Sequence, residues 1–204
     1  MNRSTSSLLI ALLFTPGAFA ASSIQLAIQG AITPNACEPT LSAGGMVDFG
    51  KMSAKSLNES AYTNLPPQTM RFSVRCEGPT FFTLNTIDNR AGTSANHETW
   101  HGLGMTPNNE KLGGTGFGLY SSIADGLPAT TITSVDGGIT WQPSVLLTHS
   151  MLTAVTRGSD LTPIAIKDYD AQIRLVTHIA PSEHLTLTDE VPVDGHATVQ
   201  LNYL

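Results

Sequence analysis

The chain has 204 residues, a formal net charge of −6 and only 13% charged side chains. An excess of acidic over basic side chains argues against nucleic acid or an anionic membrane surface as a partner. The low charge and the many Thr, Ser, Gly and Asn residues favour β-structure with polar turns over helices.

Residues 1–20 have the three parts of a secretory signal peptide. Arg3 is the basic residue, a short apolar run spans 8–14, and Ala18-Phe19-Ala20 fits the small-x-small cleavage rule. The apolar run is too short to cross a bilayer. We therefore expect an exported protein that comprises residues 21–204, a length that suits one domain.

The stretch that follows this leader, residues 21–35, alternates as a strand does. Its apolar row consists of Ile24, Leu26, Ile28 and Ile32, and Gly30 takes the remaining position. A strand at a free N-terminus has no evident partner, and a glycine inside a strand often marks close approach by another backbone. The pattern alone is equally consistent with an ordinary first strand of the chain's own sheet.

Cys37 and Cys76 are the two cysteines of the sequence. In an oxidising compartment they are expected to form one disulfide. A metal site is less well supported, because neither cysteine has a CxxC neighbour or a histidine at ligand spacing.

Strand patterns separated by turn signals recur along the rest of the chain. One of them places Met70, Phe72, Val74 and Cys76 on a single face. Residues 145–155 fit either a short helix or a strand, and no segment sustains helical periodicity over three turns. Many short strands with Gly, Pro and Asn turns predict an all-β sandwich or barrel. The predicted strands are 46–50, 70–76, 81–87, 116–122, 171–179 and 196–204.

Two regions lack these patterns. Residues 88–118 are dense in Gly and Asn and are expected to form a long loop or insertion between strands, and residues 124–143 are similarly rich in turn signals. Neither region has the composition of a linker between two domains.

The order and spacing of these features resemble the subunits of chaperone–usher fimbriae, the type 1-like pilins of Gram-negative bacteria. The features are the strand with Gly30, then Cys37, then "VDFG" at 47–50, then Cys76 closing a strand, and finally "GHATVQLNYL" at 195–204. The resemblance covers about 23–87 and 165–204. The chain is longer than a minimal pilin, and its glycine before the last strand lies closer to the terminus, so it resembles a divergent fimbrial-like branch.

The resemblance implies an immunoglobulin-like sandwich, residues 36–204, that lacks its seventh strand. Residues 21–35, with Ile24, Leu26, Ile28, Gly30 and Ile32, would be a donor strand for the groove of a neighbouring subunit, a form of β-augmentation. The last strand would line the groove and face a periplasmic chaperone with Ala197, Val199, Leu201 and Tyr203.

This family membership would make the protein a structural subunit rather than an enzyme, without a cofactor. Its partners would be a periplasmic chaperone, an outer-membrane usher, neighbouring fimbrial subunits and a host receptor. It would be exported through the periplasm to a fimbrium on the cell surface. A minor adaptor or tip subunit is the alternative within the same assembly.

Two hypotheses from other classes stay open. His97-Glu98-Thr99-Trp100-His101 matches the HExxH pattern, in which a helix presents two histidines to zinc and the glutamate acts as base. The surrounding glycines disfavour that helix, so His97 and His101 are only weak metal candidates for a periplasmic hydrolase. A self-complete carbohydrate-binding sandwich would use Trp100 and Trp141 as stacking platforms.

Overall fold

The computed structural model describes residues 36–204. The predicted leader and the row from Ile24 to Ile32 lie outside the described residues. None of the short helices within 36–204 has the length and apolar character needed to cross a membrane.

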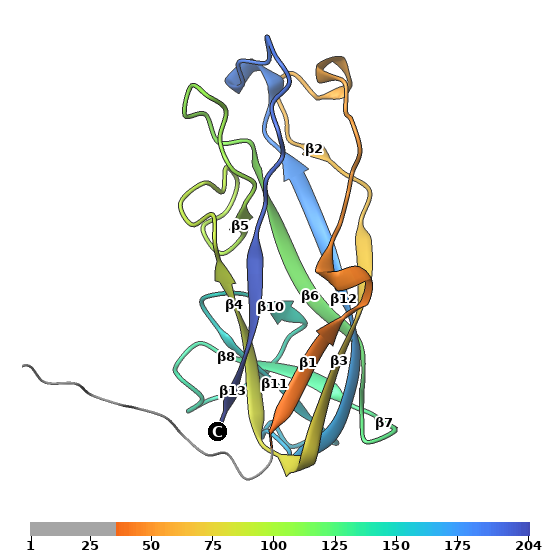
Figure 1. The fold of residues 1–204 in the computed structure, drawn as a ribbon. Coiled ribbons are helices and arrows are strands. Elements are labelled where there is room, and N and C mark those ends of the chain that lie inside the picture. The colour runs from red at the N-terminus through yellow and green to blue at the C-terminus, as the bar shows by residue number, and fades with distance from the viewer. Residues whose placement is uncertain (1–35) are drawn as a thin grey trace, which may run out of the picture. The chain divides into compact units, whose positions relative to one another are not determined.

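Residues 36–204 form two antiparallel sheets that face each other as a sandwich (Figure 1). The first sheet has the strand order β1-β3-β12-β6-β10, with β2 paired to β12 and with β5 and β7 paired to β6. Its strands are β1 (Cys37–Leu41), β2 (Thr63–Asn64), β3 (Gln68–Thr80), β5 (His101–Gly102), β6 (Gly113–Ala124), β7 (Leu127–Pro128), β10 (Leu146–Leu147) and β12 (Ile166–Ile179).

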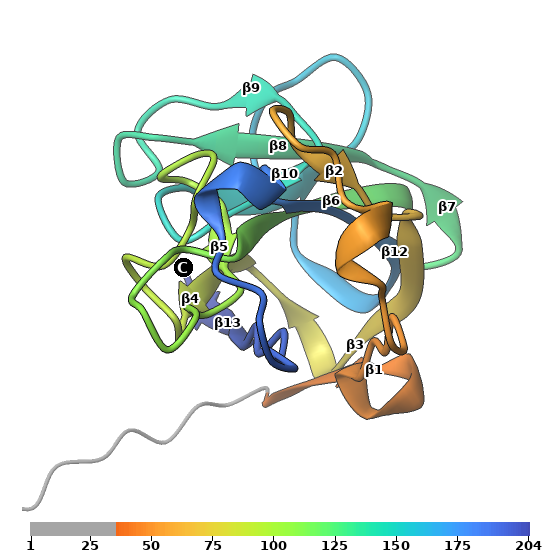
Figure 2. The same ribbon diagram turned by 90° about the horizontal axis from the view of Figure 1, so that it is seen from above.

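The second sheet has the strand order β13-β4-β11-β8-β9. Three 3-10 helices, η1 (Ser42–Gly45), η2 (Ala54–Ser56) and η3 (Ser182–His184), lie in the connections. Figure 2 shows the strands of both sheets from above. The strands of the second sheet are β4 (Phe82–Asp88), β8 (Thr130–Ser134), β9 (Gln142–Pro143), β11 (Leu152–Thr156) and β13 (Ala197–Tyr203). The expected all-β sandwich is therefore confirmed.

The core is made by the alternate residues that the two sheets turn toward each other. Phe72 and Val74 of β3 and Leu84 of β4 are almost fully buried, as period-two alternation requires. Tyr169 of β12 lies between the sheets, and its ring meets Phe72 and Phe82 edge-on, with centroids 6.2 and 6.3 Å apart. The predicted apolar face of 70–76 is confirmed.

The predicted strand at 46–50 is wrong. This segment pairs with no strand among the described residues, and Met46 is 77% exposed. Gly44 and Gly45 have φ of 62° and 75°, which turn the chain away from β3 after β1 ends. Without a neighbouring backbone, an alternating sequence gives no ladder.

The loop predicted at 88–118 ends earlier, because β6 already begins at Gly113. Glycines open this strand for a steric reason: a Cβ at Gly116 would lie 2.9 Å from the Trp100 ring, and one at Gly114 would lie 2.4 Å from Oδ1 of Asn96. The preceding loop packs directly on the strand, and only glycine fits beneath it. Glycine therefore marks close packing here, although the density of glycine in this segment predicts a loop.

A second connection also contains more strand than its turn signals indicated, because residues 130–134 form β8 inside the segment that was expected to be turns. Of the two alternatives left open for residues 145–155, strand is correct, since β10 and β11 lie there. Threonine-rich strands such as β8 are hard to distinguish from polar loops by composition.

Candidate functional site

The site is built from two strand edges that face each other across the sandwich. β1 is the last strand of the first sheet on that side, and β13 is the last strand of the second. In Figure 1 the ribbons of β1 and β13 both lie on the side that faces the viewer. No strand of residues 36–204 fills the space between these two edges.

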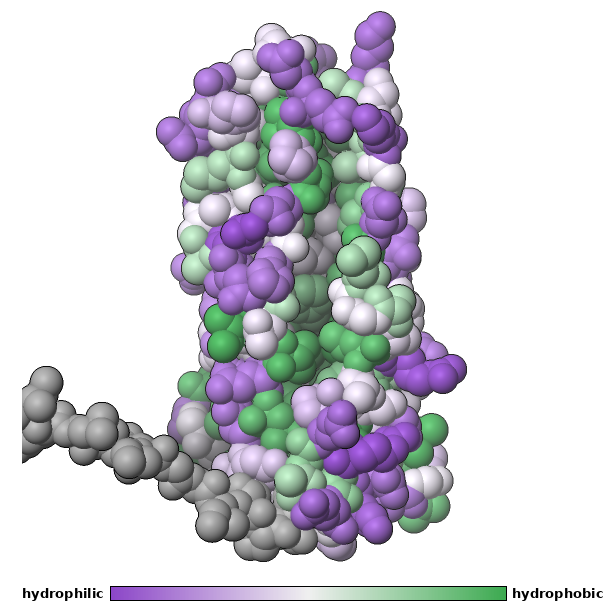
Figure 3. All heavy atoms as spheres, viewed as in Figure 1, coloured by the Kyte–Doolittle hydropathy of each residue, from purple (hydrophilic) through white to green (hydrophobic). Residues whose placement is uncertain are grey.

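A groove with a cavity of about 560 Å³ opens between the two edges. Its floor comes from β6 and β12, and its walls come from β1 and β3 on one side and β13 on the other. Figure 3 shows hydrophobic surface inside this hollow, with hydrophilic surface on both rims. The apolar lining of this part includes Leu41, Met70, Phe117, Ile173, Leu175, Ala197 and Val199.

Beyond the strands, the groove continues between two irregular segments, which we call the straps. Residues 46–57 form one strap and residues 185–196 form the other. A second apolar cluster lies beneath them, centred on Leu103, Leu112 and Ile179. The one ion pair found between the straps in the described structure joins Nζ of Lys51 to Oε2 of Glu190 at 2.8 Å. Because both side chains are more than three-quarters exposed, this pair contributes at most about 1 kcal/mol.

A polar band separates the two apolar parts of the groove. His101 lies there, 1% exposed, with Nε2 2.7 Å from the Thr86 hydroxyl and with its ring against Phe117. Burial lowers the pKa of His101, partly offset by the carboxylate of Asp88. The hydroxyls of Thr115 and Thr177, 3.0 Å apart, complete the band. The imidazole is therefore a neutral part of the groove wall.

The predicted residues of the last strand lie along one wall of the groove. Ala197 and Val199 line the cavity, and Leu201 packs against the main core. Tyr203 is 43% exposed, and its hydroxyl accepts a hydrogen bond of 2.9 Å from the backbone N–H of Cys37. The structure thus places the predicted residues of the last strand beside the opening. The predicted donor residues Ile24, Leu26, Ile28, Gly30 and Ile32 lie outside the described residues.

The groove floor and the straps were not among the predicted site residues. Ile173 and Leu175 carried a signal, because they alternate on the inner face of 171–179. Phe49 carried a misleading signal, because the alternation of 46–50 predicted a strand, and Met52 carried none; their half-buried positions depend on tertiary packing of an irregular segment.

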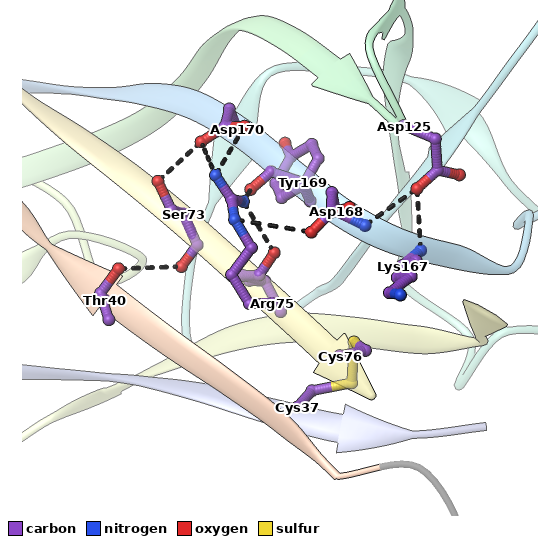
Figure 4. Close-up of polar contacts among 11 residues, drawn as sticks. Cys37, Thr40, Ser73, Arg75, Cys76, Asp125, Lys167, Asp168, Tyr169 and Asp170 are labelled. Carbon is purple, nitrogen blue, oxygen red and sulfur yellow. Dashed lines mark hydrogen bonds and ion pairs between the residues drawn. A yellow bond between two sulfur atoms is a disulfide. The ribbon is translucent and has the colours of Figure 1, made fainter. Parts of the chain in front are cut away.

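The disulfide between Cys37 and Cys76 is confirmed, and it ties β1 to β3 beside the groove. Next to it on the outer face, Arg75 lies between the carboxylates of Asp168 and Asp170 (Figure 4). Its Nη2 donates to both carboxylate oxygens of Asp170 at 2.8 and 3.0 Å. These hydrogen bonds with Arg75 lower the pKa of Asp170. Both carboxylates pair with a cation at this surface, and the arrangement is structural.

The HExxH stretch does not have the geometry of a zinc protease. Residues 97–100 form a turn and His101 begins β5, so the helix that would align the two histidines is absent. His97 lies on the exposed loop, and its Nδ1 accepts a hydrogen bond from the backbone N–H of Thr99, whereas His101 is buried. Within residues 36–204, no three His, Cys, Asp or Glu side chains gather as a metal site.

The two tryptophans lie on different sheets. Trp100 covers Gly116 of the first sheet, and its ring centroid is 4.7 Å from that of His178. Trp141 lies beside the start of β9 in the second sheet and donates its ring N–H to the carbonyl of Gly138. The two rings therefore do not form a single stacking platform.

Comparisons with known proteins place similar chains in Escherichia coli but describe no activity. Residues 26–101 match a family described as "Protein of unknown function (DUF1120)". The chain is 27% identical to Protein GltF of Escherichia coli strain K12 over 223 residues, 88% of each chain. It is 24% identical to the uncharacterized protein YhcF of the same organism over 227 residues, 94% of each. The family match takes in the disulfide, β1, β3 and β4, and both relatives align over most of their length.

Proposed function

We propose that this protein is a structural subunit of a chaperone–usher fimbria, assembled by donor-strand exchange and contributing to adhesion. The observation that carries the proposal is the apolar groove between the edges of β1 and β13, which belongs to a cavity of about 560 Å³ that continues between the straps. An open sheet edge beside exposed core residues invites another strand, and a monomer that left it uncovered would tend to aggregate.

Residues 21–35 of another copy have the composition that this groove requires. Burial of Ile24, Leu26, Ile28 and Ile32 would contribute about 6–12 kcal/mol of apolar transfer, before the cost of ordering the segment. Before assembly, a strand from a periplasmic chaperone would cover the groove, and an outer-membrane usher would be the place of exchange. A minor adaptor or tip subunit would use the same groove.

The test compares two single substitutions in the proposed donor segment. Ile28→Asp places a charge in the apolar row, and Gln29→Asp places the same charge on the opposite face of the strand. Both chains would be expressed with a periplasmic chaperone and an outer-membrane usher, and surface fibres would be counted by electron microscopy. We expect the Ile28→Asp chain to be secreted and folded but absent from fibres, whereas the Gln29→Asp chain assembles.

The groove itself can be tested with a second matched pair of substitutions, both in β13. Val199→Asp introduces a charge into the groove wall, and Gln200→Asp introduces it on the solvent side of the same strand. Only Val199→Asp should stop a chain from accepting a donor. Fibres of normal abundance from both Ile28→Asp and Val199→Asp would overturn the proposed function.

A further inference from the structure

The two edges of the groove differ in the backbone groups that they offer. In an antiparallel pair, alternate residues bond to the partner strand, and the residues between them point their N–H and C=O away from it. The backbone N–H of Glu77 donates to the carbonyl of Ala36, and the N–H of Arg71 points toward β1, where it donates to the Ser42 hydroxyl. With the register Cys37↔Cys76 to Leu41↔Phe72, the groove-facing residues of β1 are Cys37, Pro39 and Leu41.

This edge of β1 offers a further strand few donors, although the carbonyls of Pro39 and Leu41 point the same way and can accept hydrogen bonds. Pro39 has no N–H, a feature typical of protected edge strands. The N–H of Cys37 already donates to the Tyr203 hydroxyl. Leu41 alone remains as a donor on this edge, and η1 follows it immediately.

The edge of β13 has no such obstacle. The N–H of Leu204 bonds to the carbonyl of Phe81, and the N–H of Asn89 bonds to the carbonyl of His196. By the same alternation, the groove-facing residues are Ala197, Val199, Leu201 and Tyr203, none of which is proline. Their N–H and C=O groups have no strand partner among residues 36–204.

We infer that the groove takes its occupant asymmetrically: an extended segment both donates to and accepts from the backbone of β13, whereas β1 offers it almost only carbonyl acceptors. The inference rests on the proposed function for its occupant, residues 21–35 of a second copy, which ends directly before β1 in the sequence. Those residues carry one apolar row for the groove floor. Their polar face, with Gln25 and Gln29, would remain at the solvent side.

The test is amide hydrogen exchange on the disulfide-bonded chain 21–204. The chain carries Ile28→Asp, so that its own extension does not compete, and a synthetic peptide of residues 21–35 is added in trans. Peptide binding is followed separately by fluorescence anisotropy. We expect the amides of Ala197, Val199 and Leu201 to gain at least about tenfold protection, and the amide of Leu41 to change by less than about twofold.

The possible results of this experiment separate the asymmetric pairing from the proposed function. Equal protection at Leu41 and Val199 would overturn the asymmetric pairing while supporting the proposed function. Binding of the peptide without protection on β13 would also overturn the asymmetric pairing. A peptide that shows no binding at all would reject the proposed function itself.

Proline variants give a second readout at equivalent positions. Val199→Pro and Leu41→Pro each remove one groove-facing N–H that has no role in its own sheet, and Val199→Ala and Leu41→Ala control for the lost side chain. We expect Val199→Pro to bind the peptide at least about tenfold more weakly than Val199→Ala, because a ladder bond is lost and the ring blocks the approach. Leu41→Pro should stay within about twofold of Leu41→Ala, and a larger loss there would contradict the inference.

Discussion

At the residue scale, Arg75 holds an irregular part of β12 in place. Its Nη1 donates to the carbonyls of Val74 and Tyr169 at 3.0 and 2.8 Å, and its Nη2 bonds to the carboxylate of Asp170. The pairing of β12 shifts register on both sides of this point, against β3 between Ile166 and Asp168 and against β6 between Asp170 and Gln172. The guanidinium thus bonds backbone and carboxylate groups between two β-bulges.

Arg75→Met tests this role. The variant loses the bidentate ion pair and leaves the carbonyl of Tyr169 without that donor, so we expect a loss of roughly 1–2 kcal/mol in the free energy of unfolding. The partial exposure of the pair keeps the loss small. Urea denaturation measures it, with Arg174→Met on β12 as the control, since Arg174 is exposed. Equal effects of the two substitutions would contradict this account.

The buried His101 should make the stability of the fold depend on pH. Its pKa is lowered from 6.5 by burial, so below pH 6.5 the unfolded chain binds a proton that the folded chain does not. Stability should therefore fall as the pH drops below about 6.5, by up to about 1.4 kcal/mol per pH unit, until the folded-state pKa is reached. Urea titrations between pH 5 and 7.5 should show a flatter dependence in His101→Gln than in the wild type. His184→Gln, at an exposed site, should keep the slope; an unchanged slope in His101→Gln would be evidence against this assignment.

At the element scale, the sequence predicted the strands whose alternation coincides with burial between the sheets. Residues 70–76, 81–87, 171–179 and 196–204 all fall on strands β3, β4, β12 and β13, as expected. The failures have a common cause, because they occur where packing by distant segments decides the structure. The glycine-rich segment 113–116 forms a strand because the loop around Trp100 packs on it. Residues 46–50 are irregular because no strand pairs with them. The β13 wall was found from its alternation, whereas the alternation at 46–50 in the first strap predicted a strand that does not form, and neither strap was predicted to line the groove.

The disulfide makes a prediction at this scale, because it fastens a strand of only five residues to the first sheet. Closing a loop with a sequence separation of 39 stabilises the fold by about 4 kcal/mol in the chain-entropy model. Replacing Cys37 and Cys76 by serine should lower the free energy of unfolding by about that amount and increase amide exchange across β1. Strand β8, far along the second sheet, serves as the internal control and should retain its protection at denaturant concentrations that leave the fold intact. Uniform loss of protection in both strands would indicate that β1 is not a separate unit.

At the scale of the whole molecule, the sandwich has a groove where a further strand would complete its core. A segment that binds only the folded state stabilises it by mass action, by about 2.7 kcal/mol at one hundred times the dissociation constant. The melting temperature of the Ile28→Asp chain should therefore rise continuously with the concentration of the 21–35 peptide. A peptide with Ile28→Asp should give no shift, and one with Gln29→Asp should act like the wild type, because only the first charge would face the groove. If none of the three peptides changes the melting temperature, the groove between β1 and β13 does not bind residues 21–35.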